Sequence, residues 1–464
     1  MRVGRPRLRR LRGRAGGPRL TAVAAIAGCV ATAAGCVAIA GCTAGTSQPV
    51  FKRVGPLVTL RIGVYGDPGY QQSGLYAQYE RLHPNIKIIQ VAAAQQDAYW
   101  RALPASLKSG RADDIQAIPV ADISAVTGPL AGDFVPLNTL GSGGASGSAF
   151  ADAWLPWVTQ QATSPAGNTY ALGAQTGPIA ICYRTSLLAE AGLPTSPKVL
   201  ARDWSTWAGY LKLGELFRAR VPRGPAFTDS AASLYNAMAA QAKEQYYSPA
   251  GRLVLTSNPA IKGAWDTAVR AARDGLSARL TPQSKAWDRG LARASFATAV
   301  CPAWMLRQIS TLAGPLGSGG WNVTAAPGGT GNVGGFYLAL PRTGRHQQAA
   351  FQLADFLAGE QAGIDLFRTR GDFPANFAAV TAVDTVTSTY FSGAEVGKIF
   401  GETADRTPAT ILGPASGAIG ADLDGDLSQV EAGRLGSASA WRTAVRQAQA
   451  AGAAAAGAAS RPEG

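Results

Sequence analysis

From residue 58 onward, the apolar and polar positions follow first the period of a strand and then that of a helix, and this alternation repeats. Residues 58–65, VTLRIGVY, alternate in polarity and predict a strand. The next segment has Leu75, Tyr79 and Leu82 at helical spacing and predicts a helix that packs through that face. A strand at 86–91, a helix at 99–109 and a strand at 115–120 follow. This β-α-β-α-β order predicts a parallel sheet covered by helices.

The same mixture of periods continues to residue 450. Apolar runs predict strands at 170–172, 179–183, 294–300 and 334–340. Helical spacing predicts helices at 186–191, 205–218, 260–274, 346–358, 361–368 and 438–450. Residues 141–147 are rich in glycine and serine and predict a flexible surface loop, and the low-complexity segment 451–464 predicts a disordered tail. Four tryptophans are expected in the core: Trp204, Trp207, Trp265 and Trp287.

The first 57 residues have the pattern of an export signal followed by a tether. A basic segment up to residue 20 precedes an apolar segment at 21–41, an order typical of signal peptides. The alternative is an uncleaved membrane anchor, because 21 apolar residues can just span a bilayer. Ile39-Ala40-Gly41-Cys42 resembles the bacterial lipobox, and the polar sequence TAGTSQP follows it in a tether at 42–57. The sequence therefore predicts a signal peptide at 1–41, lipidation of Cys42 and attachment to the membrane through acyl chains.

Net charge and composition change this picture little. The chain has 464 residues and a formal charge of +14, but eight of the arginines lie within the first 19 residues. Without that segment the charge is 14 − 8 = +6 and no dense basic patch remains, which argues against nucleic-acid binding. The length exceeds what one hydrophobic core usually supports, so two cores are expected. The abundance of arginine, alanine and glycine is typical of GC-rich genomes and suggests an actinobacterium.

Only two cysteines, Cys182 and Cys301, follow Cys42. Both lie in short apolar runs, and disulfides persist outside the cell. A bridge between them would close a loop of about 120 residues. Two buried free thiols are the alternative.

Several segments, in order, resemble one family of proteins. They are VYGDPG with YAQYERLHPNIKI, LKSGRADDIQAI, GNTYALGAQTGPIAICYRTSLLAEAGLP, ASFATAVCPAW, GGFYLALP and LFRTRGDFPAN. Together they resemble the extracellular solute-binding proteins of ABC importers, of the sugar-binding type that includes maltodextrin-binding proteins. Ala112 stands where the family usually has proline, and Arg184 replaces its asparagine. The resemblance covers the chain from Val58 to about Ala450.

The resemblance implies an α/β fold of two lobes that are joined by hinge strands and hold a ligand between them. Lobe 1 would comprise 58–175 with 336–380, and lobe 2 would comprise 176–335 with 381–450. The chain would cross between the lobes near 175–178 and again near 334–336. A protein of this kind captures a small solute, most often a sugar, and delivers it to the permease of an ABC importer. We expect a monomer on the outer face of the cell membrane, with no cofactor, metal or catalytic residue.

The resemblance, with the chemistry of sugar sites, also implies ligand-binding residues. Sugars need flat aromatic faces for their C–H surfaces and polar groups for their hydroxyls. Trp304 matches the family's stacking tryptophan, and Asp67 lies in the first strand-to-helix turn, where the family has a ligand-contacting acid. Further candidates are Phe336, Gln175, Thr176 and Trp157. The neutral side chain of Gln175 favours a neutral ligand.

The alternatives to each site residue are structural: core packing for Trp304 and Trp157, and turn capping for Asp67. No aromatic residue stands at 118–120 or at 416–422, where relatives have cleft aromatics, and this argues against a long maltodextrin. The spacing of Asp422, Asp424 and Asp426 lacks the glycine and glutamate of a calcium loop, so a solvated acidic stretch is expected.

Other functions have less support. A hydrolase is disfavoured because neither histidine of the chain lies in a nucleophile motif and Asp67 has no obvious carboxylate partner. A glycerol phosphodiester, a polyamine or an iron chelate remain alternative ligands, and sensing without transport remains an alternative role.

Overall fold

The computed structural model describes residues 55–140 and 152–459. The predicted signal peptide, Cys42 and the predicted loop at 141–147 lie outside the described residues. In the described ranges, no helix has both the length and the apolar character needed to cross a membrane.

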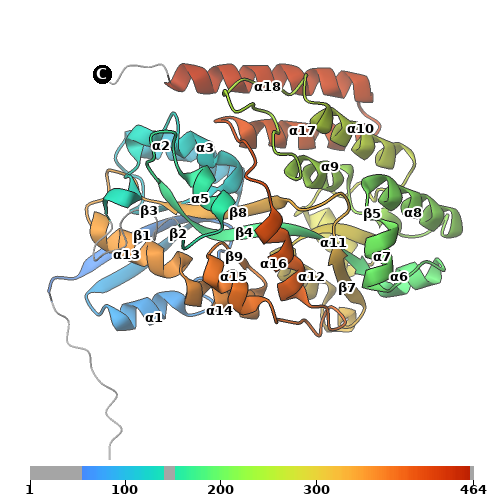
Figure 1. Cartoon of the computed structure of the whole chain (residues 1–464), viewed down its shortest axis with the longest axis horizontal. Coiled ribbons are helices and arrows are strands. Elements are labelled where there is room, and N and C mark those ends of the chain that lie inside the picture. Colours follow the sequence, from blue (N-terminus) through green and yellow to red (C-terminus); the bar gives the residue numbers. More distant parts are fainter. Residues whose placement is uncertain (1–54, 141–151, 460–464) are drawn as a thin grey trace, which may run out of the picture. The chain divides into compact units, whose positions relative to one another are not determined.

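A mixed sheet organises the described part of the chain (Figure 1). It is nine-stranded, with the order β2-β1-β3-β8-β4-β6-β5, and β7 and β9 also pair with β4. β1 pairs in parallel with β2 and β3, as the β-α-β-α-β pattern predicts, and β8 runs antiparallel between β3 and β4. The strands are β1 Val58–Tyr65, β2 Ile86–Ala93, β3 Ile115–Pro119, β4 Ala171–Arg184, β5 Ala226–Thr228, β6 Phe296–Pro302, β7 Trp321–Ala325, β8 Asn332–Ala339 and β9 Phe373–Pro374.

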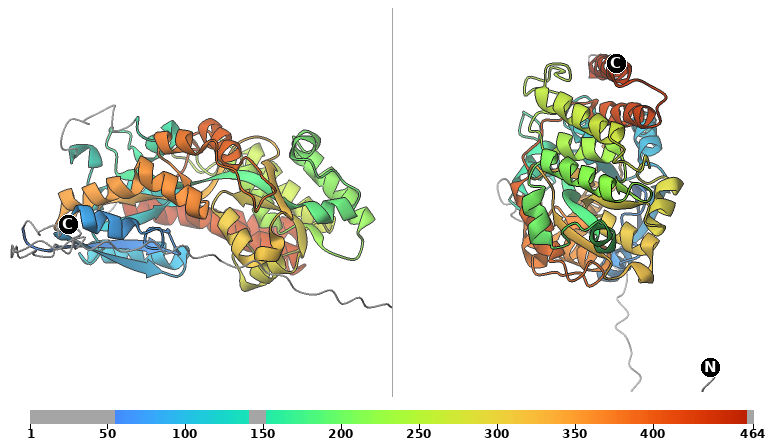
Figure 2. Two further views of the ribbon diagram at one scale, coloured as in Figure 1. Left: turned by 90° about the horizontal axis from the view of Figure 1, so that it is seen from below. Right: turned by 90° about the vertical axis from the view of Figure 1, so that its right-hand side faces the viewer.

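Helices cover both faces of this sheet (Figure 1). The helices before β6 are α1 Leu75–Leu82, α2 Gln96–Lys108, α3 Ile123–Val126, α5 Pro156–Ala162, α6 Thr185–Glu190, α7 Pro197–Asp203, α8 Trp207–Arg220, α9 Ala231–Ala240, α10 Pro259–Arg273 and α11 Lys285–Ala292. Those after β6 are α12 Met305–Ala313, α13 Gln347–Ala358, α14 Glu360–Arg370, α15 Phe377–Val383, α16 Val396–Arg406, α17 Ser416–Glu431 and α18 Ser437–Ala459. A 3-10 turn, η1, spans Val120–Asp122. Figure 2 shows α17 and α18 side by side.

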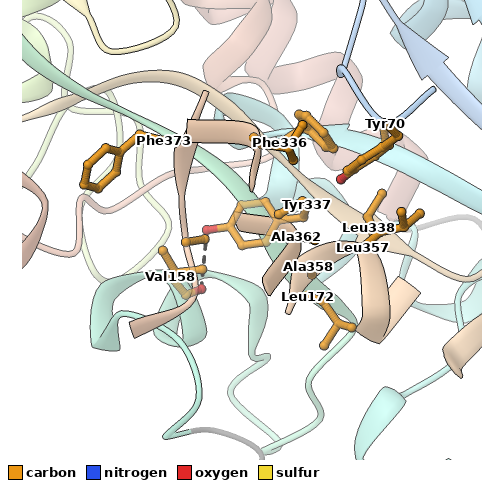
Figure 3. Packing of buried hydrophobic residues seen from close by; sticks show 14 of the residues in the cluster. Tyr70, Val158, Leu172, Phe336, Tyr337, Leu338, Leu357, Ala358, Ala362 and Phe373 are labelled. Atoms are coloured by element: carbon orange, nitrogen blue, oxygen red, sulfur yellow. Dashed lines mark hydrogen bonds between the residues drawn. The ribbon is translucent and has the colours of Figure 1, made fainter. Parts of the chain in front are cut away.

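Within the described ranges, the buried apolar residues form three clusters. The first surrounds β1, β3 and β8, the second lies between β4 and the helices α6–α8, and the third joins α9 and α10 to α17 and α18. Trp204, Trp265 and Trp287 are fully buried in them, as predicted, whereas Trp207 is only partly buried. Figure 3 shows part of the first cluster, where the Tyr337 hydroxyl lies 3.3 Å from the Val158 carbonyl oxygen.

β4 is one continuous strand where the sequence predicts two. The intervening residues 173–178 include two glycines and a proline, which favour a break. The structure keeps them in the sheet through two irregularities in the pairing with β8, between Gly173 and Gln175 and between Thr176 and Pro178. The Gly177 N–H donates to Asn332 Oδ1 at 2.7 Å, so this donor stays satisfied. β4 can therefore pair with β8 along one part and with β6 and β7 along the other.

Three further expectations need correction. Leu82 is 60% exposed because it is the last residue of α1, beyond the part of the helix that packs. The predicted disordered tail at 451–464 is helical up to Ala459, since alanine has the highest helix propensity and α18 packs against α17. The acidic stretch at 422–426 is part of α17, and Asp426 is buried.

A disulfide joins Cys182 in β4 to Cys301 in β6, with an S–S distance of 2.04 Å. Both residues are fully buried in the first cluster. The bond connects neighbouring antiparallel strands and closes 119 residues of chain.

Candidate functional site

The two strands that cross between the predicted lobes are hydrogen-bonded to each other. In the β4–β8 ladder, Gln175 pairs with Phe336 and Thr176 pairs with Gly335. Gln175 is buried, and its side-chain amide donates to the Pro68 carbonyl oxygen at 2.8 Å. The buried Thr176 hydroxyl donates to the carbonyl oxygen of Pro374 in β9, at 3.1 Å. Both side chains thus use their donors to bind backbone carbonyl oxygens of neighbouring segments where the chain crosses between the predicted lobes.

Trp304 lies directly against these strands, at the N-terminal end of α12. Its indole N–H donates to the Val333 carbonyl oxygen in β8 at 3.0 Å. A Cβ atom on Gly177 would lie 3.2 Å from the indole nitrogen, and one on Gly334 would lie 2.9 Å from it. The indole therefore reaches both crossing strands because glycine stands in each of them. The ring is only partly buried, so part of it remains accessible.

Asp67 belongs to an ionic network that the sequence did not indicate. Its carboxylate accepts from the Gly69 N–H at 3.0 Å, which is the turn-capping contact, and also from Arg370 at 3.0 Å. The Arg370 side chain is 9% exposed and also pairs with Asp372 at 2.8 Å. Burial raises the pKa of Asp372 to about 6, although Arg370 opposes this shift. The 303 residues that separate Asp67 from Arg370 in the chain hid this pairing from the sequence.

Phe336 lies in a group of aromatic rings between β8 and the end of β1. Its ring meets those of Tyr65 and Tyr70 edge to face, with both centroid distances at 6.2 Å. Figure 3 shows Phe336 beside Tyr70. The Tyr65 hydroxyl donates to the Gly335 carbonyl oxygen at 3.3 Å, and its ring lies 5.6 Å from that of Tyr99. The position of Tyr65 at the carboxyl end of a predicted parallel strand was the signal in the sequence that could have identified it.

Trp157 does not join this group. It is 5% exposed, and its indole N–H donates to the Ala404 carbonyl oxygen of α16 at 3.0 Å. α5 packs against β4, so the ring enters the core beside that strand. We therefore assign Trp157 to packing rather than to ligand binding.

Three carboxylates from separate elements influence one another through their charges: Asp97 in α2, Asp122 in η1 and Asp424 in α17. Burial, followed by the charge of Asp97, raises the pKa of Asp122 to about 7. Burial also raises the pKa of Asp424 to about 7, where a hydrogen bond from Asn236 opposes the shift and the charge of Asp97 adds to it. Within the described ranges, no group of three or more histidine, cysteine, aspartate or glutamate residues is arranged to hold a metal ion.

These raised pKa values predict that acidification stabilises the fold. Asp122 and Asp424 titrate near 7 and Asp229 near 6 in the folded protein, against 3.8 for an ordinary aspartate. Between these limits the native state binds more protons than the unfolded state, so the free energy of unfolding falls as pH rises. The loss approaches about 1.4 kcal/mol per pH unit for each acid within its titration range.

Urea unfolding between pH 5 and pH 8 measures this dependence. We expect a higher midpoint at pH 5, and a shallower decline in an Asp122→Asn variant than in the unmodified chain. A midpoint that rises from pH 5 to pH 8 would contradict the prediction.

The comparisons with known proteins identify the family of this chain and its fold. The family model described as "Bacterial extracellular solute-binding protein" matches residues 74–390. Among curated proteins, none matches the chain. A solved structure described as an extracellular solute-binding protein family 1 is 36% identical, with 85% of this chain and 100% of the other covered and a TM-score of 0.75.

Two less similar structures share the fold. One is the binding protein of an ABC transporter from B. animalis subsp. lactis, in complex with beta-1,6-galactobiose, at 19% identity, 86% and 98% coverage and a TM-score of 0.71. The other is the galacto-N-biose/lacto-N-biose I-binding protein from Bifidobacterium longum, at 18% identity, 87% and 99% coverage and a TM-score of 0.71. The predicted two-lobe α/β fold is confirmed by these likenesses. Because the family model spans more than half of the chain and the 36% identical structure is covered in full, the chain belongs to the bacterial extracellular solute-binding proteins.

Proposed function

We propose that this protein captures a mono- or oligosaccharide outside the cell and delivers it to the permease of an ABC importer. The observation that carries the proposal is Trp304, a partly accessible ring placed against both crossing strands. An indole face suits the apolar C–H surface of a sugar ring. Two proteins with the same fold are described as complexes with beta-1,6-galactobiose and with lacto-N-biose, which supports a sugar as the ligand here.

Closure of two lobes supplies the mechanism. We propose lobe 1 as 58–175 with 336–380, and lobe 2 as 176–335 with 381–450. A ligand that contacts both lobes only in the closed form shifts the population toward that form. The permease then recognises the closed form. This role needs no catalytic group and no cofactor.

Within the site we assign the candidates different roles. Trp304 stacks on the sugar, and Asp67 accepts hydrogen bonds from hydroxyls while Arg370 holds it in place. Phe336 supports the aromatic group beside Tyr65. Gln175 and Thr176 fix the backbone at the crossing, since their donors are already used there.

Attachment to the outer face of the membrane completes the proposal. Cys42 ends the apolar segment 21–41 in a lipobox-like sequence, and two acyl chains there would hold the protein stably at the bilayer. The tether at 42–57 would then connect the lipid to β1.

A thermal-shift screen tests the function. Residues 43–464 are melted with neutral sugars, glycerol phosphodiesters, polyamines and ferric chelates. A ligand at about 100 times its Kd adds ~2.7 kcal/mol to the free energy of unfolding, which raises Tm by a few degrees. We expect a mono- or disaccharide to produce this rise.

The same screen on Trp304→Ala tests the site. We expect the sugar-dependent rise in Tm to disappear, because a central aromatic contact often contributes about 2 kcal/mol or more to binding. Trp441→Ala is the matched control, since Trp441 is also partly buried but packs on Trp265 in the third cluster. A rise only with phosphodiesters, polyamines or iron would replace the ligand class, and no rise at all would favour a sensor or surface role.

A further inference from the structure

Arg370 is shared by two acids at the proposed site, and the two acids differ in their access to solvent. Arg370 Nη2 donates to Asp67 Oδ2 at 3.0 Å, and Arg370 Nε donates to Asp372 Oδ2 at 2.8 Å. The side chain of Asp67 is 37% exposed, whereas those of Arg370 and Asp372 are 9% and 5% exposed. A sugar can therefore reach Asp67 but not the two residues behind it.

The segment 370–372 packs against other parts of the proposed site. Gly371 has φ +82°, and a Cβ there would lie 3.3 Å from Leu306 Cβ and 3.6 Å from the Ala303 carbonyl oxygen. These two residues flank Trp304 at the start of α12. β9, which begins directly after Asp372, pairs with β4 at the crossing. The segment thus connects the turn that holds Asp67 to the start of α12 and to the crossing strands.

Stability does not account for a charge on Asp372. Burial raises the pKa of Asp372 to about 6, and the charges of Arg370 and Arg307 only reduce this shift. At neutral pH the ionised carboxylate therefore favours the fold less than a neutral side chain of the same shape would. A buried charge that weakens the fold beside a site points to a role in that site.

The geometry of the guanidinium group indicates which role. Its N–H groups form a planar fork that can bind both oxygens of one carboxylate. Here the fork is shared between two acids, so Asp67 receives one side-chain N–H from Arg370 and keeps lone pairs for other donors. Without the charge of Asp372, the attraction of Arg370 would fall on Asp67 alone. The fork would then turn toward Asp67 and occupy both of its oxygens.

We propose that Asp372 is a positioning residue for sugar binding, which holds the Arg370 fork so that the oxygens of Asp67 stay available to ligand hydroxyls. This inference rests on the proposed sugar-binding function. Asp372 does not contact the sugar and acts through Arg370. Asp67 then accepts from the sugar, on the accessible side of the ion pair.

This role makes sugar binding sensitive to acid. Protonation of Asp372 removes the charge that holds the fork, so the sugar favours the ionised form and its affinity falls as pH drops through about 6. The groups that face Asp372 are Arg370, Arg307, Asp67 and Tyr70. Arginine keeps its charge throughout this range. Burial raises the pKa of Tyr70 well above its usual value, so that this hydroxyl stays neutral.

Isothermal titration between pH 7.5 and pH 5 tests the proposal. The probes are glucose, galactose, maltose and lactose, and the saccharide that binds most tightly is used for the comparison. We expect its affinity to fall about fivefold from pH 7.5 to pH 5. In Asp372→Asn the affinity should be about tenfold lower at pH 7.5, and the dependence on pH should disappear.

The Tm of the free variant distinguishes positioning from a structural role. Asp372→Asn should not lower Tm, because the asparagine Oδ1 can still accept from Arg370 and Asp67 still balances its charge. A residue that served packing alone would lower Tm and leave the affinity for the sugar and its dependence on pH unchanged.

Asp229→Asn is the matched control. Asp229 is also buried, and burial raises its pKa to about 6 as well. Its carboxylate accepts from Trp287 and Ser233, which are not among the proposed site residues. The affinity of Asp229→Asn for the sugar, and its fall in acid, should match those of the unmodified chain.

The possible results separate this inference from the proposed function. A sugar affinity that changes neither in acid nor in Asp372→Asn would overturn the inference and leave sugar binding intact. If Asp372→Asn does not fold, the pH dependence of the unmodified chain decides in the same way, with Asp229→Asn beside it. Failure of every saccharide to bind at either pH would overturn both the inference and the proposed function.

Discussion

Removal of the Cys182–Cys301 disulfide is expected to lower the free energy of unfolding by about 4–5 kcal/mol, as the chain-entropy model gives for a loop of this length. The bond constrains the unfolded chain over 119 residues. For a protein of this size the loss corresponds to a fall in Tm of about 5–10 °C. Urea unfolding of the chain with and without reductant measures it directly.

The double variant Cys182→Ala, Cys301→Ala is the matched control for reduction. Its unfolding midpoint should lie at a lower urea concentration than that of the disulfide-bonded chain, and reductant should not change it. Ligand affinity should change little in the variant while it remains folded, because both side chains are fully buried. An unfolding midpoint that does not respond to reductant in the unmodified chain would refute the prediction.

Gly335→Ala is expected to destabilise the protein by about 3 kcal/mol or more, through strain and a steric clash together. Gly335 has φ +90°, and a Cβ there would lie 2.3 Å from the Gln175 carbonyl oxygen in β4. The atoms that it would meet are backbone, at the point where the two crossing strands pair. β4 and β8 would have to separate, and the bond from Tyr65 to Gly335 would weaken with them.

Gly329→Ala separates the two causes. Gly329 has φ +128°, but a Cβ added there would meet no atom within 4 Å, so it shares the strain without the clash. We expect a cost of about 1 kcal/mol there. Equal losses in the two variants, measured by urea unfolding, would show that close packing of β4 on β8 is not the cause.

The fold was largely predictable because hydrophobic periods are local. β1 begins and ends where alternation predicts, and α13 and α14 appear within a few residues of their predicted ends. β4 was divided because glycine and proline usually end strands, whereas here the side chain of Asn332, far along the chain, accepts from the freed backbone N–H. α9 and α17 were missed because many of their positions are alanine or glycine, which weakens the contrast between faces.

The site was less predictable because its important contacts join distant residues. Trp304 was found through a motif, but its bond to Val333 and its approach to two glycines depend on the folded crossing. The pairing of Asp67 with Arg370 spans 303 residues, and no local pattern indicates it. Asp122 looks like an ordinary polar residue in the sequence, and only its burial distinguishes it.

The hydrogen bond from the Trp304 indole to β8 would couple two properties that are often independent, ligand preference and lobe closure. In the proposed function, the ring that contacts the sugar is bonded to a strand that links the lobes, so we expect a substitution at Trp304 to alter the rate and extent of closure as well as the ligand preference. Evolution toward a new nutrient would then proceed through paired changes, one at the indole and one at a glycine beneath it. Relatives that bind a different ligand should therefore show correlated substitutions at positions 177, 304 and 334.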